Sequence, residues 1–176
     1  IVGGMGNAML KNTGLDIGKS ICDDGYKDLV KEILEKSSTH DCKIYYPLDV
    51  VVSKTLDGNG KIKEINEINN DEMILDIGPK TITSIKNIID KSSTVLWNGP
   101  AGYFENPNFA KGTKKILEII ADKRSKNKIY AVAGGGETVA VINKFKKLDT
   151  FNFVSTAGGA FLEYLEGKEL PGIKAL

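Results

Sequence analysis

The sequence predicts an α/β domain with a mainly parallel sheet, and its alternating pattern of segments carries that prediction. Short runs of β-branched and apolar residues alternate with longer stretches whose apolar residues recur at offsets of three and four. The first kind is typical of buried strands and the second of amphipathic helices. Strands separated by helices form βαβ units with right-handed crossovers, which build a parallel sheet. We therefore expect one domain of ordinary size over residues 1–176.

The predicted strands are short and rich in β-branched or aromatic residues. In chain order they are Ile1–Val2, Lys43–Tyr46, Met73–Ile77, Thr94–Trp97, Lys128–Ala133 and Asn152–Val154. The first of them is interpreted as the end of a buried strand. Because no initiator Met precedes it, we expect a chain that is truncated at its start.

Three segments between these strands are predicted helices, and a fourth segment breaks the alternation. The helices are Tyr26–Lys36, Thr81–Lys91 and Ala110–Arg124, each with apolar residues gathered on one face. The last of them ends in basic residues, which complement the helix dipole. Ser53–Asp71 is polar and contains two glycines. We interpret it as a surface excursion within the domain, in the form of a small hairpin.

Composition and charge exclude several classes of function. The net charge of +1 recruits neither nucleic acid nor an anionic membrane, and no apolar run approaches the roughly 20 residues that span a bilayer. The first residues do not resemble a signal peptide. Cys22 and Cys42 lack a metal-binding spacing, so we expect reduced thiols that serve as minor packing residues in a cytoplasmic protein. We also expect a monomer. His40 is the single histidine, so a histidine-based mechanism is not expected.

Glycine-bearing turns follow five of the predicted strands. They are Gly3–Gly6, Gly78–Thr81, Asn98–Gly102, Gly134–Thr138 and Ser155–Gly159. The carboxyl ends of parallel strands share one edge of a sheet, where ligands bind. Glycine lets backbone N–H groups approach a ligand, and the last two turns lead into helices, whose N-termini attract phosphate. Close packing of a helix on a strand explains any one of these turns, but not comfortably all five.

Two glycine motifs are set aside because their spacing is wrong. Gly14–Ser20 resembles a Walker A loop, but only three residues separate its glycines and the motif needs four. Gly4 and Gly6 begin a dinucleotide fingerprint, but Met9 occupies the position of its third glycine. A nicotinamide cofactor is therefore not expected.

The longer motifs resemble those of the phosphoglycerate kinase family. The nonapeptide Trp97–Glu105, WNGPAGYFE, is similar to the family's WNGPxGxFE signature. Further matches follow the family's order and cover nearly the whole chain: Pro47–Val52, Asp76–Thr81, Gly134–Thr138, Ser155–Ala160 and Gly167–Gly172. The resemblance implies the nucleotide-binding, C-terminal domain of that family, a three-layer αβα Rossmann-like fold.

The family's activity implies a set of roles for the matching residues. Its members transfer a phosphoryl group between 1,3-bisphosphoglycerate and Mg-ADP in glycolysis, giving 3-phosphoglycerate and ATP. The resemblance implies that Gly3, Gly4 and Leu75 contact the adenine, although core packing explains Leu75 equally well. It implies further that the base and phosphates are wrapped by Asn98, Pro100, Gly102 and Tyr103, and that Glu105 binds the ribose. The nucleotide phosphates are expected to contact Gly134, Gly135, Gly136 and Thr138. The transferring group is expected to face Gly136, Gly158 and Gly159.

Two positions depart from the family pattern. Glu137 stands where the family has the Asp that coordinates the Mg²⁺ of the nucleotide, and we expect it to serve as that metal ligand. The alternative is an acid that only complements the helix dipole. Ala157 replaces the first glycine of its run, where a Cβ could crowd a phosphate or restrict φ.

The family's other substrate is held by an N-terminal domain that this sequence does not contain. A lysine-bearing glycine turn of the family also precedes the position of Ile1. We therefore expect the chain alone to transfer phosphate poorly or not at all. Two other readings remain open: a stand-alone nucleotide-binding module without catalysis, and an unrelated α/β protein such as a dehydrogenase domain or a receiver-like module.

Overall fold

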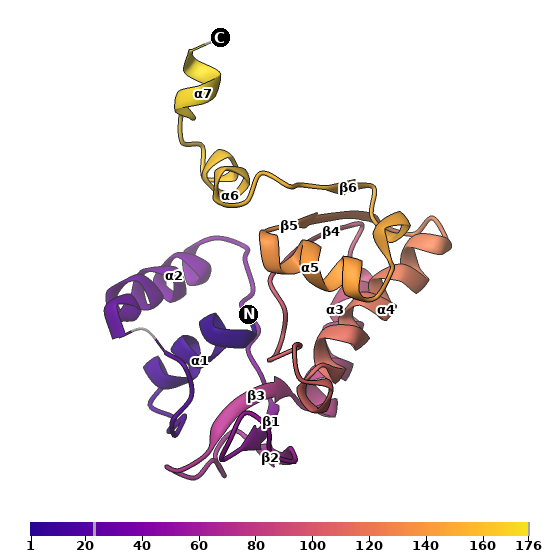
Figure 1. Ribbon diagram of the computed structural model, residues 1–176. Coiled ribbons are helices and arrows are strands. Elements are labelled where there is room, and N and C mark those ends of the chain that lie inside the picture. The colour runs from indigo at the N-terminus through magenta and orange to yellow at the C-terminus, as the bar shows by residue number, and fades with distance from the viewer. Residues whose placement is uncertain (23, 176) are drawn as a thin grey trace. The chain divides into compact units, whose positions relative to one another are not determined.

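The computed structural model describes residues 1–22 and 24–175, and it divides into two compact units (Figure 1). The first unit is Ile1–Ile85 with Ala101–Lys115, and the second is Lys86–Pro100 with Ile116–Leu176. The predicted α/β class is confirmed, with a parallel sheet connected by helices. Among the described residues, no helix is long and apolar enough to cross a membrane.

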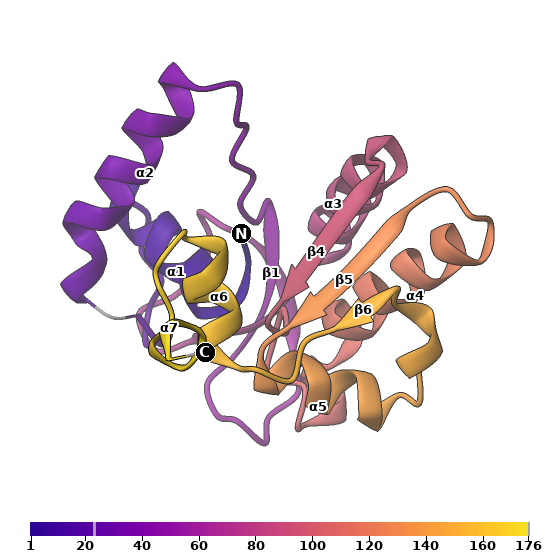
Figure 2. The same ribbon diagram turned by 90° about the horizontal axis from the view of Figure 1, so that it is seen from above.

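The second unit is built on a parallel sheet. Its strands β4 (Thr94–Asn98), β5 (Tyr130–Gly134) and β6 (Phe153–Val154) lie in the order β4-β5-β6 (Figure 2). The connection from β4 to β5 contains α4 (Lys111–Ser125), and that from β5 to β6 contains α5 (Gly136–Lys144). Since both crossovers step in the same direction, right-handed connections put α5 and the end of α4 on one face of the sheet.

The core of this unit lies between that face and the helices. Ala131 and Ala133 alternate along β5 and are fully buried, because their small side chains let helices approach the sheet closely. Trp97 of β4 is 7% exposed and stacks on Phe151 with a centroid distance of 6.0 Å. The helices contribute fully or almost fully buried side chains: Leu117, Ile120, Val141 and Ile142. The chain then continues into α6 (Gly159–Leu165) and α7 (Pro171–Lys174).

The first unit contains a separate, antiparallel sheet. Its strands are β1 (Asp49–Ser53), β2 (Lys61–Glu64) and β3 (Met73–Ile77), in the order β2-β1-β3. Val50 pairs with both Lys63 of β2 and Ile77 of β3. β2 lies within the segment 53–71 that breaks the pattern of the sequence, and it forms a hairpin with β1.

Two helices of the first unit pack together through a small apolar cluster. They are α1 (Gly3–Asn12) and α2 (Lys27–Thr39), and the cluster consists of Ala8, Met9 and Val30. Cys22 packs against this cluster, as predicted for a thiol in the core. Cys42 is exposed, so its predicted packing role is wrong.

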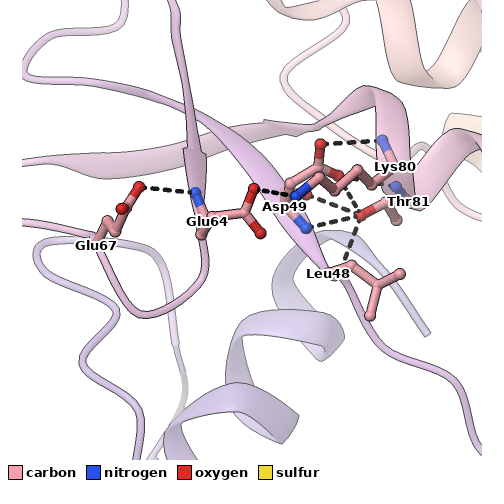
Figure 3. Close-up of polar contacts among 6 residues, drawn as sticks. All are labelled: Leu48, Asp49, Glu64, Glu67, Lys80 and Thr81. Atoms are coloured by element: carbon pink, nitrogen blue, oxygen red, sulfur yellow. Dashed lines mark hydrogen bonds and ion pairs between the residues drawn. The ribbon is translucent and has the colours of Figure 1, made fainter.

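A buried carboxylate anchors the start of α3 (Pro79–Lys91) (Figure 3). Asp49 of β1 is 1% exposed and accepts hydrogen bonds from Lys80 N at 3.0 Å and Thr81 N at 2.8 Å. The Thr81 hydroxyl in turn accepts from Leu48 N and Asp49 N. The first N–H groups of a helix have no partner within the helix. Asp49 therefore acts as a cap supplied by a distant strand.

Most predicted elements are confirmed, and three expectations are wrong. Lys43–Tyr46 is not a strand, because aromatic and β-branched residues favour a strand only where a partner strand is available. Val2 is extended but forms no described strand; the chain enters α1 directly, so Gly3 and Gly4 are helical residues and not a turn after a strand. Met73–Ile77 pairs antiparallel with β1, so the turn after it does not share the edge of the parallel sheet.

Candidate functional site

Two turns of the second unit are joined at the carboxyl ends of β4 and β5. Gly99 N donates a hydrogen bond to Thr138 Oγ1 at 2.6 Å, and Thr138 is fully buried. Asn98 Oδ1 lies 2.5 Å from the place that a Cβ on Gly135 would occupy. Gly99 and Gly135 have φ of +91° and +90°, the left-handed region that glycine adopts without strain. These contacts hold the two turns as one structure.

The three glycines after β5 differ in what requires them. A Cβ on Gly134 would lie 2.3 Å from a ring carbon of Phe161 in α6, so Gly134 serves internal packing. Gly135 is required by its positive φ and by Asn98. Gly136 is exposed, begins α5, and a Cβ there would meet no atom within 4 Å. The sequence suggested open space for a ligand at all three glycines, Gly134, Gly135 and Gly136. Among these three, the structure has such space at Gly136.

The turn after β6 lies at the same edge of the sheet. Ser155 N donates to Ala133 O at 2.8 Å, and Ser155 Oγ accepts from Ala157 N at 3.3 Å. Gly158 has φ of +56° and precedes α6; Cβ atoms on Gly158 and Gly159 would meet nothing within 4 Å. The described non-glycine residues with positive φ are Asn127 and Lys146, so Ala157 causes no backbone strain in its place.

The structure thus brings together three of the five predicted glycine turns. Those after β4, β5 and β6 share one edge because these strands are parallel neighbours (Figure 2). The sequence-predicted residues of this edge, here called the glycine edge, are Asn98, Pro100, Gly134, Gly135, Gly136, Glu137, Thr138, Gly158 and Gly159.

The remaining predicted residues belong to the first unit. Tyr103 N donates to Leu75 O at 2.7 Å, and a Cβ on Gly102 would lie 2.4 Å from the same oxygen, so both residues lie against the middle of β3. Leu75 is 7% exposed, whereas Glu105 is exposed. Gly3 and Gly4 lie in the first turn of α1, where Gly3 has φ of +63°.

Asp76 is a buried acid that the sequence reasoning did not single out. It is 1% exposed, and its carboxylate accepts from Gly112 N at 2.7 Å and from Ile77 N at 2.9 Å. Burial raises its pKa to about 6, and backbone donors including Gly112 offset only part of that increase. An acid within the apolar run MILDI was the available signal, because a charge in a buried strand needs a structural partner.

The raised pKa of Asp76 predicts a fall in stability with increasing pH. Between pH 4 and 6 the native carboxyl keeps its proton while the unfolded one releases it, so the contribution of Asp76 to the free energy of unfolding should decrease by about 3 kcal/mol across this range. Urea unfolding at several pH values measures the decrease. Asp76→Asn should remove it, and Asp57→Asn, at an exposed residue, should retain it. Equal slopes for Asp76→Asn and the unmodified chain would contradict this assignment.

Glu137 is the predicted metal ligand, and it lies exposed in the first turn of α5. Within the described part of the chain, no group of three or more His, Cys, Asp or Glu residues could hold a metal ion. Mg²⁺ in nucleotide sites is bound by one or two carboxylates together with substrate phosphates and water. A single exposed carboxylate beside the glycine edge fits a cation that arrives with a nucleotide.

Comparisons with known proteins agree with the sequence motifs. The family model described as phosphoglycerate kinase matches residues 1–168. The phosphoglycerate kinases of Zymomonas mobilis and Azorhizobium caulinodans are 46% and 41% identical to the chain, over its full length and 45% of theirs. The solved phosphoglycerate kinase of Coxiella burnetii is 39% identical with a TM-score of 0.90, covering 98% of this chain and 44% of that one.

A more distant solved structure has the same fold. The phosphoglycerate kinase of Pyrococcus horikoshii is 29% identical with a TM-score of 0.80, over 97% of this chain and 42% of that one. The chain therefore spans less than half the length of the curated relatives that it matches. The family model covers nearly all of the chain, and the solved structures are highly similar to it. The chain therefore belongs to the phosphoglycerate kinase family.

Proposed function

We propose that the chain supplies the Mg-ADP/ATP site of a phosphoglycerate kinase, which transfers phosphate between 1,3-bisphosphoglycerate and ADP in the cytoplasm. The observation that carries this proposal is the glycine edge, where Gly136 opens α5 toward free space. The N–H groups of this first helical turn, and the positive end of the helix dipole, are suited to phosphate oxygens. Family membership supports the choice of an adenine nucleotide.

The proposed roles follow the chemistry of each residue. Gly134–Thr138 receive the nucleotide phosphates, with Gly136 in direct contact, while Gly158 and Gly159 face the transferring group. Asn98, Pro100, Gly102 and Tyr103 wrap the nucleotide, Glu105 accepts hydrogen bonds from the ribose, and Gly3, Gly4 and Leu75 contact the base. Mg²⁺ held by the nucleotide and Glu137 would neutralise charge on the phosphate oxygens.

This set of residues suits phosphoryl transfer. The transition state is loose, so catalysis depends on positioning and on stabilising oxygen charge, which backbone N–H groups do without exchanging protons. A catalytic histidine or cysteine is not needed. The second substrate would be bound by a part of the relatives' length that this chain does not span. The chain alone is therefore expected to bind nucleotide as a monomer but to transfer phosphate poorly or not at all.

Calorimetric titration of the chain with Mg-ADP tests the proposal. We expect saturable binding, about tenfold weaker in Glu105→Ala because a charge-assisted hydrogen bond to the ribose is lost. Glu137→Ala should bind equally with and without Mg²⁺, whereas the unmodified chain should bind more tightly with it. Glu35→Ala is the control, because Glu35 is an exposed residue of α2. A folded chain that shows no saturable binding would refute the proposed site.

A further inference from the structure

Two fully buried threonines bind backbone N–H groups in the first residues of the loop that joins β4 to α4. Thr138, in α5, accepts from Gly99 N at 2.6 Å within the second unit. Thr113, in α4, accepts from Ala101 N at 3.0 Å and from Gly102 N at 3.3 Å within the first unit. Both side chains are 0% exposed, so their hydroxyl groups are directed into the protein.

These contacts assign the two hydroxyl groups a role that differs from ligand binding. A buried backbone N–H without a partner costs about 1–3 kcal/mol, which applies in full to Ala101 N and in part to the partly buried N–H groups of Gly99 and Gly102. Each threonine therefore favours one conformation of the backbone that it binds. Gly99 also has φ of +91°, a conformation that glycine adopts without strain. The residues between the two contacts include Pro100, and Tyr103 follows directly.

We propose that Thr138 is a positioning residue that pre-forms residues 98–100 for nucleotide binding, that Thr113 does the same for residues 101–103, and that neither hydroxyl contacts the nucleotide. The inference rests on the proposed function, because it takes that loop as part of the nucleotide site. A pre-formed loop binds more tightly because its conformational entropy is lost before the ligand arrives.

The test compares a valine and a serine at each position. Valine keeps the shape of threonine but accepts no hydrogen bond, while serine keeps the hydroxyl group. We expect Thr138→Val to weaken Mg-ADP binding about tenfold and to speed exchange of the Gly99 amide proton. Thr113→Val should also weaken Mg-ADP binding about tenfold and should speed exchange of the Ala101 and Gly102 amide protons. The serine variants should return both readouts to within about twofold of the unmodified chain.

A matched control separates loop positioning from general loss of stability. Thr81 is 3% exposed and also accepts two backbone N–H bonds, but it does so at the start of α3. Thr81→Val should destabilise the chain while the folded protein keeps its Mg-ADP affinity and its Gly99 exchange rate. Affinities are compared at a temperature where all variants are folded.

Each outcome decides one question. Unchanged affinity and exchange in Thr138→Val, or a serine variant as weak as the valine variant, would overturn the positioning role. An equal loss of affinity in Thr81→Val would overturn it too. If the unmodified chain binds no Mg-ADP, the proposed function itself fails, and the exchange of Gly99 still shows whether Thr138 holds the loop.

Discussion

Gly136→Ala is expected to leave the chain as stable as before but to weaken Mg-ADP binding tenfold or more, about 1.4 kcal/mol at least. A Cβ on Gly136 would meet no protein atom within 4 Å, and Gly136 does not have a positive φ, so nothing within the chain opposes alanine. Alanine also favours a helix by about 1 kcal/mol over glycine in a helix interior. The added methyl group would instead project into the space that the proposal assigns to phosphate.

Gly134→Ala is the matched comparison, because its main expected effect is on stability. Its Cβ would lie 2.3 Å from a ring carbon of Phe161, so it should destabilise the chain by about 1–3 kcal/mol through overpacking. Thermal unfolding and calorimetric titration of both variants measure the two effects. Destabilisation by Gly136→Ala with unchanged nucleotide affinity would contradict the assignment of Gly136 to the ligand.

Asp49→Ala is expected to lower the free energy of unfolding by about 3–5 kcal/mol. The substitution leaves Thr81 N, which is buried, and Lys80 N, which is partly buried, without their acceptor, and the loss of a buried acceptor costs about 1–3 kcal/mol. It also removes a negative charge from the positive end of α3. Urea unfolding at neutral pH measures the loss.

The control for Asp49 lies in the same cluster. Glu64 pairs with Lys80 at 2.5 Å, but both side chains are largely exposed, at 43% and 62% (Figure 3). Exposed ion pairs contribute about 0–1 kcal/mol, so Glu64→Ala should change stability little. Asp49→Asn keeps one oxygen acceptor, so its loss in the free energy of unfolding should lie between those of Asp49→Ala and Glu64→Ala. Similar losses for Asp49→Ala and Glu64→Ala would show that the cluster, and not the buried cap, carries the stability.

Elements that depend on local pattern could be predicted from the sequence. Thr94–Asn98, Tyr130–Gly134 and α3 lie within two residues of the predicted bounds, because β-branched runs and a period of 3.6 residues are local properties. The same pattern could not assign Met73–Ile77 to a sheet. Its paired residues in Asp49–Ser53 lie 20 or more residues away, and strand propensity does not specify whether a partner runs parallel or antiparallel.

Part of the candidate site could likewise be predicted from the sequence, and part could not. The sequence by itself determined that glycine turns follow the strands β4, β5 and β6, and through its motifs it determined the family. Only the tertiary structure distinguished Gly134, which accommodates Phe161 from 27 residues further along the chain, from Gly136, which meets open space. It alone revealed that the Thr138 hydroxyl binds Gly99. The physical reason is that a residue's role depends on the atoms that surround it, and distant segments supply most of those atoms.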